Sequence, residues 1–166
     1  MEEWNRILPQ HLWIYNKLFL SQCLGYTCGP MGLEVPEPGF YIVRPCMNLM
    51  DTGEYHTEWI EKSTEHLHPG EFWCQVFEGD HLSIDYEYTA DATGCYPQWA
   101  EDHSVDYHIK RQKRALKNTD GIWTDIDIKV PYPNILTTIG LYRYGWINCE
   151  FIGDKLIEVH FRRTRY

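Results

Sequence analysis

Apolar and polar residues alternate most clearly near the C-terminal end of the sequence. The alternation covers residues 146–151 and resumes over residues 156–161, and Gly153 and Asp154 lie between the two runs. Because successive side chains of a strand point to opposite faces, this alternation predicts two β-strands. Glycine accepts a positive φ and aspartate bonds to its own turn backbone, so the pair predicts a tight hairpin connection.

Both strands of this predicted hairpin carry polar side chains. Glu150 lies on the first strand, and Glu158, His160 and Arg162 share one face of the second. If the two polar faces coincide, two carboxylates, an imidazole and a guanidinium meet on one patch. Mg²⁺ is usually bound by one or two carboxylates together with phosphate oxygens and water, so the hairpin is a candidate metal site. The alternative is a solvated strand face whose salt bridges add little stability.

Patterns elsewhere predict further strands and a few short helices. Apolar residues spaced three and four apart predict helices at residues 8–24, 57–66 and 134–142. Apolar runs predict strands at residues 40–45, 72–77, 81–88 and 122–130. The second and third of these strands are expected to form a hairpin, and the alternate polar residues of the third to face solvent. We therefore expect an α+β fold of antiparallel sheet layers with few helices.

Length and charge limit the class of protein. A chain of 166 residues is expected to form one domain (residues 1–166), with an N-terminal helix and loop over residues 1–39. Its net charge of −9 disfavours nucleic-acid and anionic membrane partners. The N-terminal residues lack a signal-peptide pattern and no apolar run reaches about eighteen residues, so we expect a cytoplasmic protein. None of the six cysteines forms a C-x-x-C pair, which favours free thiols over a zinc ribbon.

Two further groups of residues have a functional and a plain interpretation. Arg44 ends a predicted strand just before a turn-forming loop, where it could meet phosphates or be an ordinary surface arginine. His56, His66 and His68 are close in sequence and could bind a transition metal, but no supporting carboxylate or cysteine pattern accompanies them.

The closing hairpin resembles the final motif of the ATP-grasp superfamily. That motif is an acidic residue, a turn, and then hydrophobic-Glu-hydrophobic-Asn-Pro-Arg. By this resemblance Glu150 and Glu158 are the two metal-binding carboxylates, and Arg162 matches the arginine. His160 stands where the family has its metal-binding asparagine, and Phe161 replaces the proline.

Two earlier segments resemble the same family in the same order, so that the resemblance covers residues 40–162. Residues 75–85 are similar to its hinge segment, in which His81 occupies the position of the ribose-binding carboxylate. The residues implied beside the adenine are Gln75, Val76 and Phe77. Residues 41–45 are similar to the strand whose lysine holds the phosphates, with Arg44 as the cation. The resemblance implies an ATP-grasp-like fold with two small lobes around a cleft.

The implied activity is that of an ATP-dependent carboxylate ligase. Such a protein binds Mg²⁺-ATP and forms an acylphosphate on a carboxylate, here an unidentified small molecule or peptide. Arg143 and Arg162 are expected to act on the phosphates by charge-assisted bonds. Mn²⁺ would tolerate the imidazole of His160 better than Mg²⁺. The alternative is a non-catalytic ATP-grasp-derived module that binds a nucleotide or a protein partner, which the histidines at positions 81 and 160 favour.

Overall fold

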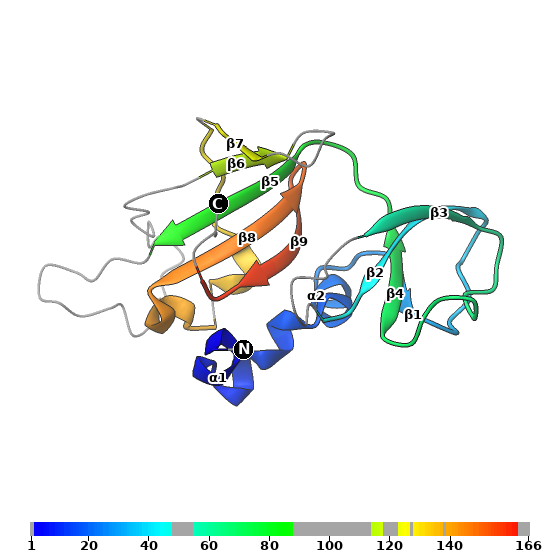
Figure 1. Cartoon of the computed structure of the whole chain (residues 1–166), viewed down its shortest axis with the longest axis horizontal. Coiled ribbons are helices and arrows are strands. Elements are labelled where there is room, and N and C mark those ends of the chain that lie inside the picture. The colour runs from blue at the N-terminus through cyan, green and yellow to red at the C-terminus, as the bar shows by residue number, and fades with distance from the viewer. Residues whose placement is uncertain are drawn as a thin grey trace, which may run out of the picture. The chain divides into compact units, whose positions relative to one another are not determined.

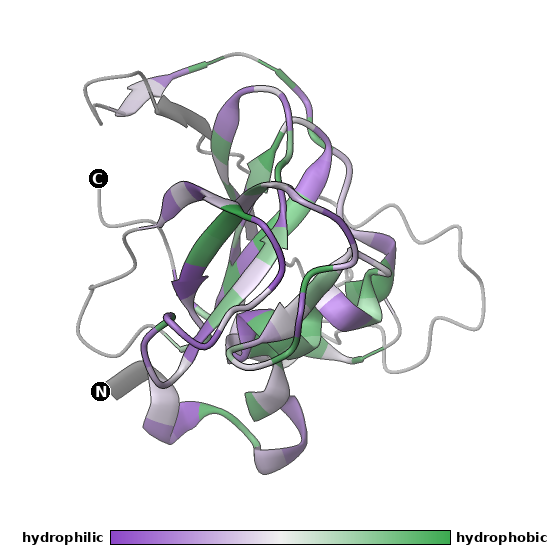
Figure 2. Ribbon diagram, turned by 90° about the vertical axis from the view of Figure 1, so that its right-hand side faces the viewer, coloured by the Kyte–Doolittle hydropathy of each residue, from purple (hydrophilic) through white to green (hydrophobic). Residues whose placement is uncertain are grey.

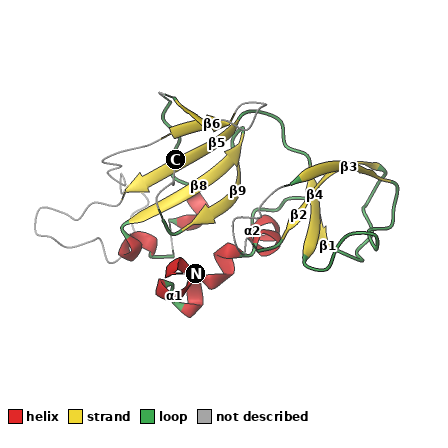
Figure 3. Cartoon of the chain, in the orientation of Figure 1, coloured by secondary structure: helices red, strands yellow, loops and turns green. Residues whose placement is uncertain are grey.

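The chain folds into two antiparallel β-sheets with a few short helices, an α+β architecture (Figures 1 and 3). The computed structural model describes residues 2–47, 55–87, 114–117, 123–126, 128–137 and 139–162. Contacts divide the chain into two compact units. Unit 1 comprises Met1–His11 and Gly79–Tyr166, and unit 2 comprises Leu12–Glu78. The residues of the expected N-terminal helix and loop, 1–39, are shared between the two units.

Unit 2 contains a four-stranded sheet with the order β1-β4-β2-β3. Its elements are α2 (Lys17–Cys23), β1 (Cys28–Pro30), β2 (Gly39–Pro45), β3 (His56–Ile60) and β4 (Glu71–Gln75). The central strand β2 pairs antiparallel with both β3 and β4. One face of this sheet buries an apolar cluster made by Val35, Tyr41, Val43, Ile60, Leu67 and Trp73. The predicted strand at residues 40–45 is thereby confirmed as β2.

Unit 1 contains a five-stranded sheet with the order β7-β6-β5-β8-β9. Its strands are β5 (His81–Glu87), β6 (Arg114–Lys117), β7 (Trp123–Asp125), β8 (Trp146–Ile152) and β9 (Lys155–His160). Its helices are α1 (Glu2–Arg6) and the 3₁₀ turns η2 (Asn134–Leu136) and η3 (Leu141–Tyr144), while η1 (Pro9–Tyr15) crosses the boundary between the units. The predicted C-terminal hairpin is confirmed as β8–β9. Of the strand expected at residues 122–130, the described residues 123–126 and 128–130 contribute β7 alone.

Apolar side chains of β5, β8 and β9 meet on one face of the unit 1 sheet. The cross-strand pairs are Leu82 with Phe151, Ile84 with Cys149 and Tyr86 with Ile147. Cys149 also faces Val159 on β9, and all of these side chains are buried. Figure 2 shows apolar and polar residues alternating within the same strands. Such facing apolar pairs stabilise a sheet through cross-strand contact and burial.

Two of the four alternate polar positions of β5 are buried as well, contrary to the expectation that they face solvent. Ser83 and Asp85 are 1% and 2% exposed. The prediction was wrong because a polar side chain can be buried where it is hydrogen-bonded, so alternation alone does not decide which face meets solvent. Asn148 of β8 supplies donors to both, as described below.

The hairpin expected between residues 72–77 and 81–88 does not form. β4 pairs with β1 and β2, whereas β5 pairs with β6 and β8 in the other sheet. The intervening residues include Gly79, whose φ of +119° is open to glycine alone among ordinary residues. The Gly153 amide then donates to the Asp80 carbonyl at 2.8 Å, so the start of β5 is held against the β8–β9 turn.

The helical predictions were partly wrong. Residues 56–60 form the edge strand β3 in place of the expected helix, because all five of them pair with residues 39–43 of β2. The N-terminal helix is interrupted at Asn16, whose side chain caps α2 by accepting from the Phe19 amide at 3.1 Å. Among the described residues, no helix is both long and apolar enough to cross a lipid bilayer.

The N-terminal residues are tied to the C-terminal part of unit 1. The Leu8 amide donates to the Tyr144 hydroxyl at 3.1 Å, and His11 Nδ1 lies 2.6 Å from the same oxygen. Arg6 donates to the Phe161 carbonyl at 3.4 Å, and the ring of Phe161 packs edge-on against Tyr144. Unit 1 is therefore assembled from the two ends of the sequence.

The described cysteines differ in burial, which predicts their reactivity. Burial raises the pKa of Cys74 to about 12 and raises that of Cys149 well above its ordinary value, whereas Cys23 is exposed. Because the thiolate is the reactive form, iodoacetamide at about pH 8 should label Cys23 in the native protein. Cys74 and Cys149 should be labelled only after denaturation, as read by peptide mass spectrometry. Equal labelling of all three in the native state would contradict their burial.

Candidate metal centre on the C-terminal hairpin

Three metal-ligating side chains converge on the β8–β9 hairpin. Glu150 lies opposite Glu158, and His160 is two residues further along β9 on the same face. One ligand atom from each residue lies within 4.8 Å of the others. Within the part of the chain that the structure describes, no other group of three such residues meets this criterion.

A β-bulge makes the two polar faces of this hairpin coincide. From the turn, Ile152 pairs with Lys155 and Phe151 with Leu156, so a regular ladder would place Ile157 opposite Glu150. The register shifts between Glu150 and Phe151, and Glu158 becomes the partner of Glu150. One extra residue in a strand moves every later side chain to the other face. The bulge therefore creates the carboxylate pair.

Close polar contacts link the cluster. His160 Nε2 lies 3.1 Å from Glu158 Oε1 and 3.9 Å from Glu150 Oε1. His81 Nε2, from β5, lies 2.8 Å from the other oxygen of Glu150, Oε2. Side-chain exposure is 11% for both Glu158 and His160 and 16% for Glu150, so water is largely excluded from these contacts. Electrostatic interactions are stronger in such a setting than at a solvated surface.

The protonation of His160 reports the negative character of the site. Burial acts to lower the pKa of His160, but the hydrogen bond and charge of Glu158, together with the charge of Glu150, outweigh burial and raise it. Arg162 acts in the opposite direction. The site thus favours a proton on His160, and a metal would have to displace that proton, because only the neutral imidazole can act as a ligand.

The donor set fits a divalent cation that accepts mixed ligands. Two carboxylates suit hard ions such as Mg²⁺, whereas an imidazole suits Mn²⁺ and later transition metals better. Glu150 and Glu158 face each other directly, and like charges in that position repel. A bound cation between them would remove this repulsion. The residues present are therefore chemically compatible with a metal, and with Mn²⁺ more than with Mg²⁺.

A buried polar network continues from the cluster across β8 and β5. Asn148, which faces His160 across the hairpin, donates from Nδ2 to Ser83 Oγ at 2.9 Å and to Asp85 Oδ1 at 2.8 Å. The polar strip therefore spans three strands of the unit 1 sheet. Sequence patterns did not single out Asn148, Ser83 or Asp85 for this role; the signal was the matching alternation of polar residues in residues 81–88 and 146–151.

The two arginines expected to act on phosphates are in unit 1. Arg162 follows β9, is partly buried, and lies near enough to His160 for its charge to lower the pKa of that residue. Arg143 belongs to η3, and its side chain lies outside the described side chains. The phosphate role of both residues stays a prediction.

Unit 2 contains a buried cation at the predicted phosphate-binding position. Arg44 is 4% exposed and its guanidinium lies 5.2 Å from the centre of the Phe72 ring, so the interpretation as an ordinary surface arginine is wrong. Sequence reasoning missed a second cation, Lys17, which is 2% exposed. Its amide donates to the Cys46 carbonyl at 2.9 Å.

Both cations act on the same thiol. Burial raises the pKa of Cys46, and the charges of Lys17 and Arg44 partly offset this. The charged groups of Lys17 and Arg44 therefore both lie near the thiol of Cys46. The available sequence signal for Lys17 was the N-cap Asn16, because the helix that starts after it turns Lys17, Leu20 and Ser21 toward the interior.

The residues expected beside the adenine are at the end of unit 2. Gln75 ends β4, and its side chain accepts from the Thr27 amide at 2.8 Å. Val76 is exposed. Phe77 is partly buried and packs edge-on against Tyr26, with ring centres 4.7 Å apart. His81 begins β5 in unit 1 and contacts Glu150. The cleft implied by the family resemblance stays a prediction.

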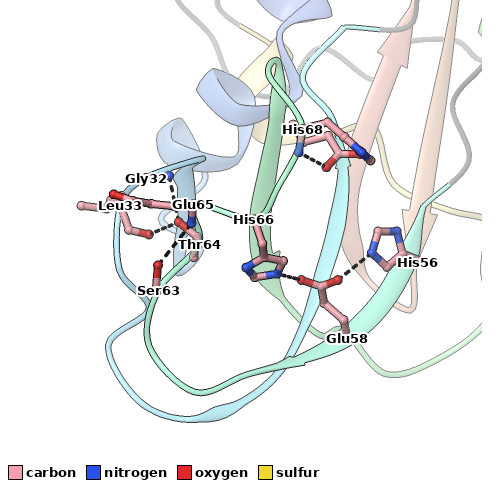
Figure 4. A network of polar contacts seen from close by, with 10 residues as sticks. Gly32, Leu33, His56, Glu58, Ser63, Thr64, Glu65, His66 and His68 are labelled. Carbon is pink, nitrogen blue, oxygen red and sulfur yellow. Dashed lines mark hydrogen bonds and ion pairs between the residues drawn. The ribbon is translucent and has the colours of Figure 1, made fainter.

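The three histidines considered as a transition-metal site do not converge (Figure 4). His56 and His66 contact the two oxygens of Glu58 at 3.0 and 2.5 Å. His68 contacts a different carboxylate, that of Glu71. Glu58 therefore acts as a bridge between two imidazoles on the surface of unit 2.

This bridge predicts a small, pH-dependent contribution to stability. Partial burial acts to raise the pKa of Glu58, but its bonds to His66 and His56 outweigh burial and lower it. A lowered native pKa stabilises the fold above the unfolded-state pKa and loses that effect as pH falls through the native pKa. Glu58→Gln should therefore cost about 0.5 kcal/mol near about pH 6 and nothing near about pH 2. Urea unfolding at both pH values measures this, and a pH-independent cost would contradict it.

Comparison with models of known protein families found no match for this chain, and comparison with curated proteins found none either. Any chemical role of the site is therefore argued from its own residues.

Proposed function

We propose that the chain is an ATP-grasp-like protein that binds Mn²⁺- or Mg²⁺-ATP and forms an acylphosphate on a carboxylate substrate. The observation that carries this proposal is the meeting of Glu150, Glu158 and His160, with ligand atoms within 4.8 Å of one another. In the sequence Glu150 and Glu158 match the two metal-binding carboxylates of the ATP-grasp closing motif, and His160 stands where the motif has its asparagine. Bulges are over-represented next to active sites, where they redirect side chains, and the bulge that pairs Glu150 with Glu158 is of this kind.

The residues of the site would have separate roles in binding the metal and the phosphates. Glu150, Glu158 and His160 would hold the metal, which when bound offsets the negative charge of phosphate oxygens. Arg162 would hold phosphate oxygens by charge-assisted bonds. A substrate carboxylate oxygen would attack the γ-phosphorus, and the bond to the bridging oxygen would break to release ADP.

Unit 2 offers cations suited to phosphate groups. Lys17 and Arg44 are both buried, and charges in such positions interact strongly with an anion. Arg44 has the forked geometry that matches phosphate oxygens, whereas Lys17 supplies a compact charge. Arg44 is the cation that the family resemblance assigns to the nucleotide phosphates, and it keeps that role in the proposal.

A second function, binding without turnover, is supported by one contact. His81 stands at the family's ribose-binding carboxylate position, but it contacts Glu150 at 2.8 Å. With an imidazole also at position 160, the site has fewer oxygen ligands than the family motif provides. A regulatory module that binds a metal nucleotide is therefore the alternative.

The experiment is a thermal shift with ATP and either Mn²⁺ or Mg²⁺, combined with an assay of ADP release over a panel of carboxylates. Wild type should be stabilised, and Glu158→Gln should lose the shift. Glu87→Gln is the matched control, because Glu87 lies on β5 of the same sheet but outside the cluster. It should keep the wild-type shift.

The outcomes separate the two functions. A shift with ADP release on any carboxylate supports the ligase, and a shift without ADP release across the panel supports the binding module. No shift with either metal would reject both functions.

A further inference from the structure

We infer that His81 is a positioning residue for the metal site: it holds Glu150 in the orientation that lets its second oxygen face Glu158 and His160. This inference rests on the proposed metal-binding function and assigns His81 a role other than a ribose contact. The central observation is the 2.8 Å contact between His81 Nε2 and Glu150 Oε2. The other oxygen, Oε1, is the one that lies 3.9 Å from His160 Nε2.

The chemistry of this contact fixes which atom carries the hydrogen. A carboxylate oxygen accepts, so Nε2 of His81 must donate, and its lone pair is then not available to a metal. His81 is also outside the group whose ligand atoms lie within 4.8 Å of one another. It is therefore a supporting residue and not a fourth ligand. Metal-binding carboxylates are commonly oriented by such hydrogen bonds.

The backbone of His81 is fixed relative to the hairpin that it supports. The Gly153 amide in the β8–β9 turn donates to the carbonyl of Asp80, the residue before His81. His81 itself pairs with Ile152, two residues along β8 from Glu150. Diagonal neighbours across a sheet are within reach of long side chains such as histidine and glutamate. The contact is thus the expected result of the strand register.

The imidazole ring is also held from its other side. Trp123 of β7 packs edge-on against it, with ring centres 5.1 Å apart. The His81 side chain is 12% exposed, so little water competes for its contact with Glu150. A fixed ring with a fixed backbone can restrict the rotamer of Glu150 before a cation arrives. Because the Glu150 side chain then loses less conformational freedom when a cation binds, the contact with His81 should increase the affinity of the site for a metal.

The test measures binding of Mn²⁺ alone by titration calorimetry, with metal-free thermal melts to check folding. His81→Ala should weaken Mn²⁺ binding about 10- to 100-fold, the usual effect of removing a residue that orients a ligand. His81→Gln should restore most of the affinity, because its amide can still donate to Glu150. His68→Ala is the matched control, since His68 pairs with Glu71 in unit 2 and should leave Mn²⁺ binding unchanged.

A double variant shows whether His81 acts through Glu150. In a Glu150→Gln background, His81→Ala should cause little further loss, because the group it orients has been replaced. Equal Mn²⁺ affinity for wild type and His81→Ala would overturn the positioning role and leave the proposed metal site in place. Failure of wild type to bind Mn²⁺ would overturn both.

Discussion

Gly79→Ala should destabilise the chain by about 3 kcal/mol or more, a cost that combines backbone strain and overpacking. Gly79 has a φ of +119°, a conformation that side-chain-bearing residues rarely adopt. A Cβ at this position would lie 2.7 Å from Gly153 Cα and 3.0 Å from Gly153 N. Both are backbone atoms of the β8–β9 turn, so relief of the clash requires the start of β5 to move.

Gly70→Ala is the matched control for this prediction. Gly70 also has a positive φ, +85°, but a Cβ there would meet no atom within 4 Å. It should therefore show strain without overpacking, at about 1–2 kcal/mol. Urea unfolding of both variants measures the difference. Equal costs would contradict the close packing of Gly79 on Gly153.

Asn148→Leu should destabilise unit 1 by about 3 kcal/mol, although leucine has the same number and branching of side-chain heavy atoms. Asn148 is 2% exposed and its two N–H groups serve Ser83 and Asp85. A hydrogen bond to a charged group contributes about 1.5–3 kcal/mol, and leaving a buried acceptor short of a donor adds to the loss. Chemical denaturation followed by tryptophan fluorescence measures the effect.

The partner of Asn148 can be identified by a double-mutant cycle with Asp85→Leu. If the main cost of Asn148→Leu arises from the Asp85 carboxylate, the same change should cost only about 1 kcal/mol when Asp85 is already leucine. A full cost in both backgrounds would show that Asn148 stabilises the sheet by packing, independently of Asp85.

Local chemistry was enough to predict part of the fold. The C-terminal hairpin followed from strand alternation and from the turn chemistry of Gly153 and Asp154, which are properties of adjacent residues. The strand that contains Arg44 was found for the same reason. The bulge that pairs Glu150 with Glu158 was not predictable in this way, because it depends on how two strands pair and not on either strand alone.

The errors arose where long-range pairing overrides local pattern. Residues around Gly79 look like a hairpin turn, yet the strands on either side join different sheets. Lys17 was missed because an apparent helix over residues 8–24 hid the cap at Asn16, which shifts the buried face. The predicted cluster of Glu150, Glu158 and His160 was nevertheless found on adjacent strands, because the bulge brings together two polar faces that each follow from the alternation of its own strand.

The division of the chain at Gly79 has a consequence for the order of folding during synthesis. Unit 2 is continuous, and every residue of Leu12–Glu78 leaves the ribosome before β5 does. The first segment of unit 1, Met1–His11, is made at the start, but it cannot dock until Tyr144 of η3 and Phe161, which follows β9, have been made. Domains generally fold as they emerge. We therefore expect unit 2 to fold first on the ribosome, with the N-terminal segment left to dock as one of the last steps.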